Sequence, residues 1–276
     1  MNKFRDRKRR ILGQHFLKSS GVLDKIVRVI NPLPDDLIIE IGAGRGELTF
    51  PLAEKAARVV AFEKDERLVP ILQKKAFSNL TVIAKDVLTV NFKDVINKNP
   101  GFFGKAKLIG NLPYSISSPL FFKVIEEREA LQKCVFLVQK EVAERVCAQP
   151  GSKSYAPLSI LVHLYFLANL HFTVHPGSFA PPPRVESALL SLEKRPDPLF
   201  PVSAEHMFLR FLQDCFKQRR KTLANNLIAS GLPAARVEAA CQATGLDRKI
   251  RPEQVTVAQF VGLFDLFDRR LKETNP

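Results

Sequence analysis

The stretch that decides the fold runs from residue 37 to residue 63 and reads LIIEIGAGRGELTFPLAEKAARVVAFE. It begins and ends with apolar runs, 37–41 and 58–63, whose length and β-branched content are typical of buried strands. A glycine-rich turn and a helical pattern over 47–56 separate the two runs. Strand, turn, helix and strand in this order predict a βαβ unit, in which the two strands lie parallel.

The same alternation continues toward the carboxyl terminus. Further apolar runs predict strands at 80–84, 106–110, 134–138, 170–174 and 187–193. Helical patterns lie between them at 67–76, 117–128 and 139–148. This alternation predicts an α/β protein whose parallel sheet has helices on both faces. Between 157 and 174 the pattern does not decide where a helix ends and a strand begins.

The character of the chain changes after residue 193. The segment KRPDPLFPVS, residues 194–203, contains three prolines and is typical of a linker or domain junction. Beyond it the apolar residues recur at helical spacing, as do Met207, Phe208, Phe211, Leu212, Cys215 and Phe216. We therefore expect two domains, an α/β domain over 1–195 and a small helical domain over 203–276.

The charge of the chain is strongly positive. Its 276 residues carry a formal net charge of +14, with a pI of about 9.8. A balance of this kind predicts a polyanionic partner, for which nucleic acid is the first candidate. The cations cluster in the first ten residues, MNKFRDRKRR, and in KQRRK at 217–221. Such runs are also compatible with a solvated tail and an exposed helix face.

Membrane, disulfide and metal signals are weak in this sequence. The longest apolar stretch, 157–170, is interrupted by polar residues and is shorter than the ~18 residues of a spanning helix. No secretory signal peptide is visible, so we expect a cytoplasmic protein without a membrane partner. No CxxC or HExxH spacing occurs, which predicts reduced thiols and no metal. The thiols are Cys134, Cys147, Cys215 and Cys241.

The turn after the first strand is a candidate cofactor site. Gly42, Gly44 and Gly46 form GxGxG, and glycine allows a tight turn and a close approach of ligand to backbone. We expect the following helix to offer free backbone N–H groups to an anion. The spacing is not GxGxxG and no Walker A lysine motif is present, which disfavours a dinucleotide and ATP hydrolysis.

Polar residues follow the next three predicted strands. Glu63 lies about 20 residues past the glycine-rich turn, where an acid can accept hydrogen bonds from ribose hydroxyls. Asp86 could contact an adenine amino group, or simply cap a turn. With Asn111 they would share the carboxyl edge of a parallel sheet. These residues indicate a nucleoside with an anionic group that is not a polyphosphate, and S-adenosylmethionine fits that description.

Several motifs now resemble a known family. EIGAGRGELT, FEKD, KDVL and NLPYSISSPLFF occur in order, with GQHFL at 13–17 before them and SFAPPPRVESALL at 178–190 after them. This sequence resembles the KsgA/RsmA-type ribosomal RNA adenine N6,N6-dimethyltransferases over nearly its whole length. The resemblance implies a class I (Rossmann-like) S-adenosylmethionine-dependent methyltransferase sheet with a helical C-terminal domain. The implied reaction is dimethylation of two adjacent adenosines in the 3′-terminal hairpin loop of 16S rRNA.

The resemblance also implies site residues. Those expected to contact the cofactor are His15, Leu17, Gly42, Glu63, Asp86 and Asn111. Ser115 departs from the asparagine found in many relatives. The partner expected from the resemblance is 16S rRNA within the 30S subunit or its precursor, and we expect the enzyme to be a monomer.

The NLPY loop, residues 111–114, is the expected seat of methyl transfer. The Asn111 carbonyl oxygen can accept a hydrogen from the adenine N6 amine. Pro113 has no N–H, so the Leu112 carbonyl is available as a second acceptor. Tyr114 would stack on the base, and Phe179 could close its other face. Without the resemblance, these residues would be explained equally well as a turn asparagine and partly buried aromatic rings.

Two other functions are compatible with parts of the sequence. One is an RNA-binding assembly factor that uses this fold without catalysis. Because the glycine-rich turn, Glu63 and Asn111 are all present, such a role would be additional to catalysis. The other is an Erm-type enzyme acting on large-subunit rRNA, or a DNA adenine methyltransferase. The forms of NLPYSISSPLFF and FAPPPRVES favour the small-subunit enzyme.

Overall fold

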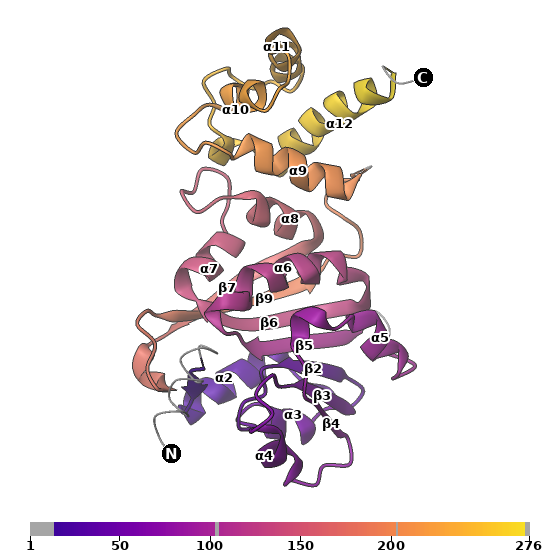
Figure 1. Ribbon diagram of the computed structural model, residues 1–276, viewed down its shortest axis with the longest axis vertical. Coiled ribbons are helices and arrows are strands. Elements are labelled where there is room, and N and C mark those ends of the chain that lie inside the picture. The colour runs from indigo at the N-terminus through magenta and orange to yellow at the C-terminus, as the bar shows by residue number, and fades with distance from the viewer. Residues whose placement is uncertain (1–13, 103–104, 203, 274–276) are drawn as a thin grey trace. The chain divides into compact units, whose positions relative to one another are not determined.

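The computed structural model describes residues 14–102, 105–202 and 204–273 (Figure 1). The basic run in the first ten residues lies outside them. The chain divides into two compact units, and the first comprises the described residues up to 144 together with 167–194. The second unit comprises 145–166 and the residues from 195 onward.

The first unit is built on a seven-stranded sheet with the strand order β4-β3-β2-β5-β6-β9-β7. The five strands β4, β3, β2, β5 and β6 are parallel. The predicted α/β sheet is confirmed. Its strands are β2 (Leu37–Ile41), β3 (Arg58–Phe62), β4 (Leu80–Ile83), β5 (Ala106–Asn111), β6 (Leu131–Gln139), β7 (Phe166–Val174) and β9 (Ser187–Lys194).

The sheet is not parallel throughout, because β9 runs against its neighbour β6. This strand pairs antiparallel with β6, from Lys133 opposite Glu193 to Gln139 opposite Ser187. The segment between β7 and β9 contains no α-helix, only η4 (Pro176–Ser178) and the short strand β8. A parallel neighbour requires a long crossover, usually a helix, whereas an antiparallel strand does not.

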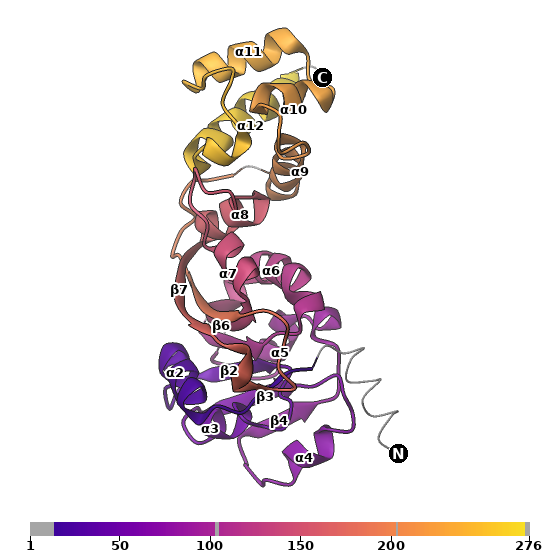
Figure 2. The same cartoon turned by 90° about the vertical axis from the view of Figure 1, so that its left-hand side faces the viewer.

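Helices cover both faces of the sheet (Figure 2). Ile26, Val27 and Ile30 of α2 pack with the strand residues Ile38 and Val59 on one face. On the opposite face, Phe121 of α6 meets Phe136 of β6 edge-on at 5.6 Å between ring centroids. The helices of this unit are α2 (Ser20–Ile30), α3 (Thr49–Ala53), α4 (Val69–Gln73), α5 (Phe92–Asn97), α6 (Ser117–Glu126) and α7 (Lys140–Val146), whose last residues belong to the second unit.

A small second sheet joins two segments far apart in the chain. β1 (Phe16–Leu17) pairs antiparallel with β8 (Phe179–Ala180), with Leu17 opposite Phe179. The two strands belong to GQHFL and SFAPPPRVESALL, which flank the methyltransferase-like motifs in the sequence. Pairs of two residues carry no periodic pattern, so only the tertiary structure reveals that these motifs meet.

A buried ion pair links β5 to the residue before β2, and its lysine also bonds the residue that follows α2. Lys107 Nζ lies 2.6 Å from Asp36 Oδ2 and also donates to the Asn31 carbonyl at 2.7 Å. Asp36 Oδ2 accepts a further hydrogen bond from the Leu33 N–H. Removing one partner of such a pair typically costs about 3–5 kcal/mol. The lysine in β5 therefore stabilises the strand that leads into the NLPY loop.

The second unit is helical in its described residues. Its core includes aromatic contacts such as Phe208 with Phe264, whose ring centroids are 5.2 Å apart. None of the helices in the described part of the chain is long and apolar enough to cross a membrane. The helices are α8 (Pro157–Tyr165), α9 (Glu205–Cys215), α10 (Leu223–Ala229), α11 (Ala234–Ala243) and α12 (Val257–Glu273).

The units divide the chain differently from the expected domains at one place. Residues 145–166 lie in the range expected for the α/β domain but group with the helical unit. The Leu199 N–H donates to the Leu164 carbonyl at 2.8 Å, and the Tyr155 ring contacts Phe216. These contacts hold α8 to the segments that follow residue 195. In the stretch left undecided by the sequence, α8 ends at Tyr165 and β7 begins at Phe166.

Candidate functional site

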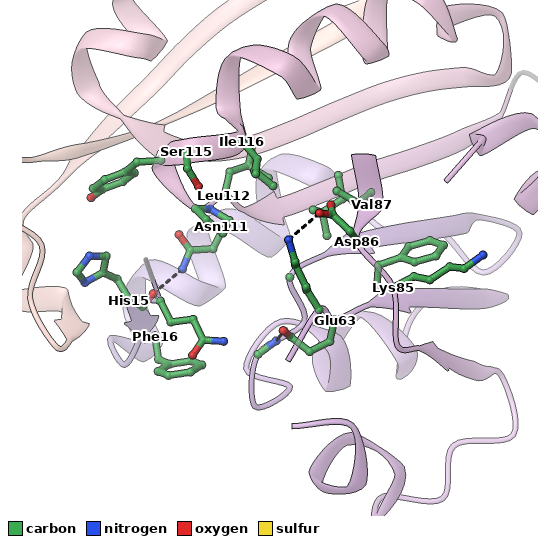
Figure 3. Close-up of a pocket in the computed structure, with 18 of the residues that line it drawn as sticks. His15, Phe16, Glu63, Lys85, Asp86, Val87, Asn111, Leu112, Ser115 and Ile116 are labelled. Carbon is green, nitrogen blue, oxygen red and sulfur yellow. Dashed lines mark hydrogen bonds and ion pairs between the residues drawn. The ribbon is translucent and has the colours of Figure 1, made fainter. Parts of the chain in front are cut away.

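A pocket lies where β2, β3 and β5 end (Figure 3). Gly42, Glu63, Asp86 and Asn111, the four strand-end positions singled out in the sequence, all line it. They converge because the strand order β4-β3-β2-β5 places the ends of four parallel strands along one edge. The pocket therefore lies entirely in the first unit.

The glycine-rich turn depends on its glycines. Gly42, Gly44 and Gly46 have φ values of +70°, +61° and +93°, which L side chains rarely adopt. A Cβ on Gly46 would lie 2.3 Å from the Phe50 ring. A Cβ on Gly44 would meet the Phe16 ring at 3.3 Å. No other residue type would fit the turn at Gly46 without moving Phe50.

The N–H groups of the turn itself, residues 42–46, are all bonded within the protein. Those of Gly42 and Ala43 donate to the Phe62 carbonyl, and that of Gly46 to the Ala43 carbonyl. The two that remain donate to side-chain carboxylates: Gly44 to Glu63 at 2.8 Å and Arg45 to Glu47 at 3.2 Å. Acids therefore surround this turn, which favours a ligand that carries positive charge there.

Glu63 is the central acid of the site. Its carboxylate is 5% exposed and also accepts the Asp65 N–H at 2.7 Å. Burial raises its pKa, and the hydrogen bonds from Asp65 and Gly44 oppose that rise. Each carboxylate oxygen can accept more than one hydrogen bond. Glu63 can thus hold the turn and still accept hydrogen bonds from a ligand's hydroxyl groups.

Asp86 has the capping role weighed for it in the sequence, and its contact with an adenine amino group stays a prediction. Its Oδ1 accepts the Leu88 N–H at 3.0 Å and caps η1 (Val87–Thr89). Its Oδ2 accepts from Lys64 Nζ at 2.8 Å, as the dashed line in Figure 3 marks. The hydrogen bond from Lys64 is the main cause of the lowered pKa of Asp86.

The segment before β1 forms another wall of the pocket. Gln14, His15 and Phe16 line it, whereas Leu17 is buried in the core and does not. His15 Nδ1 lies 2.8 Å from the Pro181 carbonyl. Because a carbonyl only accepts, Nδ1 carries the proton in this contact.

Asn111 presents one atom to the protein and another to the pocket. Its Nδ2 donates to the His15 carbonyl at 2.8 Å (Figure 3). A carbonyl only accepts, so the amide nitrogen must face His15, and Oδ1 remains an acceptor. The hydrogen bond thus orients the side chain as well as joining the NLPY loop to the N-terminal segment.

The Leu112 carbonyl is a second acceptor in the same loop. The Leu112 N–H donates to the Leu137 carbonyl at 3.0 Å, and the Ile116 N–H bonds the Pro113 carbonyl. Among the backbone hydrogen bonds of the described residues, none ends on the Leu112 carbonyl. Pro113 offers no N–H. Asn111 and Leu112 both line the pocket.

Two aromatic rings flank these acceptors. Tyr114 is half-buried, and its ring centroid lies 5.7 Å from that of His15. Its hydroxyl is 3.4 Å from Ser187 Oγ. Phe179 lines the pocket but is also a buried member of the core cluster that contains Leu17. Phe179 therefore packs in the core and also lines the pocket.

Sequence reasoning missed several lining residues. Phe16 stood within the quoted GQHFL motif and Lys64 within FEKD, but neither had a role assigned. Phe62 and Val87 also line the pocket, and their apolar character fits a nucleobase face. Among the residues that the structure describes, no group of three or more His, Cys, Asp or Glu is placed to hold a metal ion.

Glu40 is a third acid, buried behind the turn. It is 1% exposed, and its Oε2 has no hydrogen-bond partner among the described residues. Burial, reinforced by the nearby Glu47 and Glu63, raises the pKa of Glu40 to about 8. Three acids thus lie close to the glycine-rich turn, and the raised pKa favours the neutral form of Glu40.

Comparisons with known proteins agree with these features. A family profile described as Ribosomal RNA adenine dimethylase matches residues 5–269. A Ribosomal RNA small subunit methyltransferase A from Syntrophus aciditrophicus is 39% identical over 257 residues, covering 91% of each chain. The protein of that name from Streptococcus pneumoniae serotype 2 is 40% identical over 261 residues, covering 92% of this chain and 89% of that one.

Solved structures show the same similarity over both units. A dimethyladenosine transferase from Plasmodium falciparum has a TM-score of 0.79 and 27% identity, covering 93% of this chain and 98% of that one. The 23S rRNA methyltransferase ErmE has a TM-score of 0.72 and 26% identity, covering 92% of this chain and 99% of that one.

The buried Glu40 predicts a pH dependence of stability. Its pKa is about 8 in the folded protein and 4.5 in its ordinary state, so the folded form holds the proton more tightly. The contribution of Glu40 to stability is therefore fully present below pH 4.5 and is lost as the pH rises toward 8. Over that range the free energy of unfolding falls by at most about 1.4 kcal/mol per pH unit. In Glu40→Gln, the unfolding free energy from urea denaturation should fall less between pH 5 and pH 8 than in the wild type. Glu54→Gln, an exposed control, should show the same change in unfolding free energy between pH 5 and pH 8 as the wild type. The same change in all three proteins would contradict the assignment.

Proposed function

The chain belongs to the ribosomal RNA adenine dimethylase family, and we propose that it dimethylates N6 of two adjacent adenosines in the 3′-terminal hairpin loop of 16S rRNA, using S-adenosylmethionine. It is an rRNA adenine dimethyltransferase with a class I methyltransferase fold. The observation that carries the proposal is the pair of acceptors in the NLPY loop, Asn111 Oδ1 and the Leu112 carbonyl, beside a pocket lined with acids.

The residues of the pocket fit S-adenosylmethionine. Glu63 offers acceptors for ribose hydroxyls, and Asp86 Oδ2 offers one for an adenine amino group. Phe62, Val87 and Ile116 supply apolar surface for the base. The acids around the glycine-rich turn suit the positive charges of the sulfonium and the ammonium. His15 and Asn111 complete the proposed contacts, whereas the buried side chain of Leu17 could only support them from the core.

The methyl donor supplies an electrophilic carbon on a sulfonium, and the protein has to present the acceptor nitrogen to it. The lone pair of adenine N6 is delocalised into the ring, so the amine is a poor nucleophile. Asn111 Oδ1 and the Leu112 carbonyl would accept the N6 hydrogens and favour the pyramidal amine that can attack. Both acceptors belong to one short loop anchored by Leu137 and His15, so their geometry is set before substrate binds.

Tyr114 and Phe179 would position the target base. A base stacked on an aromatic ring gains about 1–3 kcal/mol. Bases in a hairpin loop can leave their stack more easily than bases in a duplex. No carboxylate is needed as a general base, because the N6 proton becomes acidic once the methyl group has been transferred. The monomethylated amine has one hydrogen left, so one of the two acceptors would hold it for the second transfer.

The substrate follows from the family and from the closer relatives. Proteins named for the small subunit are 39% and 40% identical to this chain, whereas ErmE, named for 23S rRNA, is 26% identical. These identities favour 16S rRNA over the large-subunit alternative. We further propose that the enzyme acts as a monomer in the cytoplasm on the 30S subunit or its precursor. In this proposal the helical unit contacts the RNA.

Methyl transfer from radiolabelled S-adenosylmethionine tests the substrate assignment. Unmethylated 30S subunits, naked 16S rRNA, 50S subunits and DNA would be compared side by side. Label should enter 30S subunits, and nuclease digestion should yield N6,N6-dimethyladenosine from adjacent positions. Label confined to 50S subunits or DNA would overturn the assignment.

Asn111→Ala tests the role of the amide oxygen. The variant loses an acceptor used during transfer, so kcat should fall by about 100-fold or more while 30S binding stays close to wild type. Ser115→Ala is the matched control, because Ser115 lines the same pocket without a role in the proposed chemistry. It should keep near wild-type turnover. Near wild-type turnover of Asn111→Ala would refute the role of Asn111.

The basic cluster at 217–221 tests the RNA contact of the helical unit. Its four cations are exposed, and Arg219 also donates to the Lys153 carbonyl. Arg220→Gln with Lys221→Gln should weaken 30S binding and flatten its dependence on salt, by about one unit of slope per lost phosphate contact. Lys93→Gln with Lys98→Gln removes the same charge from the first unit and should leave the slope unchanged. If the two double variants behave alike, the cluster is not part of the interface.

A further inference from the structure

Lys64 competes for the carboxylate oxygen that the proposed cofactor needs. Its ammonium lies 2.8 Å from Asp86 Oδ2, and both side chains line the pocket. The other carboxylate oxygen, Oδ1, is held by the Leu88 N–H at the start of η1. The carboxylate therefore cannot turn away from Lys64 without losing its cap. Oδ2 is the oxygen that both Lys64 and an adenine amino group would use.

We propose that Lys64 is a latch on the adenine end of the pocket: it competes with the exocyclic amino group of the cofactor for Asp86 Oδ2 and thereby lowers cofactor affinity. The proposal rests on the proposed function, in which Asp86 accepts from that amino group. Lys64 is then a positioning residue that acts through Asp86. Nothing in the methyl-transfer chemistry requires it.

The exposure of the pair explains why the latch can open. The Lys64 side chain is 59% exposed and that of Asp86 27%, so water competes for both charges. Exposed ion pairs of this kind contribute little to stability and weaken as salt rises. The Leu88 N–H still bonds the Asp86 carboxylate when the lysine leaves. The open state therefore retains an anchored acceptor.

Lys85 provides the contrast within the same pocket. It precedes Asp86 in the chain and also lines the pocket. Among the ion pairs of the described residues, none involves Lys85. Removal of its charge changes the electrostatic potential of the pocket without freeing Asp86. Comparing variants of Lys64 and Lys85 therefore distinguishes competition for Asp86 Oδ2 from a general effect of the charge in the pocket.

The test measures binding of S-adenosylhomocysteine by isothermal titration calorimetry. Lys64→Met keeps an unbranched apolar side chain and removes the ammonium. It should bind about two- to fivefold more tightly than the wild type at low salt, and the difference should shrink as salt is raised. Lys85→Met should gain less than Lys64→Met, because it changes the charge of the pocket without freeing Asp86. Unchanged or weaker binding by Lys64→Met, or an equal gain in Lys85→Met, would overturn the latch.

A second ligand tests the competition itself. S-inosylhomocysteine carries a carbonyl oxygen where adenine has its amino group, so it has no hydrogen to donate to Asp86 at that position. Lys64→Met should bind it no better than the wild type does. A similar increase in affinity for both ligands would mean that Lys64 acts through the general charge of the pocket and not by competition for Asp86.

Asp86→Asn distinguishes failure of the latch from failure of the proposed function. The asparagine oxygen can still cap Leu88, but its amide then presents a donor to the pocket. S-adenosylhomocysteine should bind about tenfold more weakly, and adding Lys64→Met should then have no effect. Wild-type affinity in Asp86→Asn would refute the adenine contact, and with it the latch. Weaker binding there, without a gain in Lys64→Met, would refute the latch alone.

Discussion

The site depends on one buried carboxylate, Glu63. It bonds the N–H of Gly44 in the turn after β2 and the N–H of Asp65 after β3. The two loops are thereby held together at the edge where β2 and β3 end. A buried carboxylate is costly unless it is hydrogen-bonded, and these bonds offset part of that cost. Its raised pKa shows that the compensation is incomplete. A ligand with hydroxyl donors or positive charge would complete it.

The N-terminal segment joins the proposed cofactor side of the pocket to the methyl-acceptor side. The His15 carbonyl accepts from Asn111, and the His15 ring donates to the Pro181 carbonyl. The pairing of β1 with β8 holds both contacts in place. Asn111 consequently uses its amide nitrogen for this hydrogen bond and leaves its oxygen available as an acceptor. Loss of the segment would remove the hydrogen bond that orients that oxygen.

Much of the fold was predictable because its signals are local. Residues 37–41, 58–62 and 106–110 were expected as strands and are strands, since short apolar runs bounded by turns are distinctive. The family was also recognisable from motifs such as NLPYSISSPLFF, and the comparisons confirm it. The direction of β9 and the grouping of 145–166 with the helical unit were not predictable. Both depend on contacts between segments distant in sequence.

The sequence by itself determined the strands, the glycine-rich turn and the polar residue after each strand, because each depends on a few neighbouring residues. Only the tertiary structure decided how those residues bond. It showed that the N–H groups of the turn are taken by internal acceptors, that Leu17 faces the core, and that Lys64 lies on Asp86. It also decided which atom of Asn111 is free. Hydrogen bonds act over about 3 Å, and only folding brings residues from distant parts of the chain within that distance.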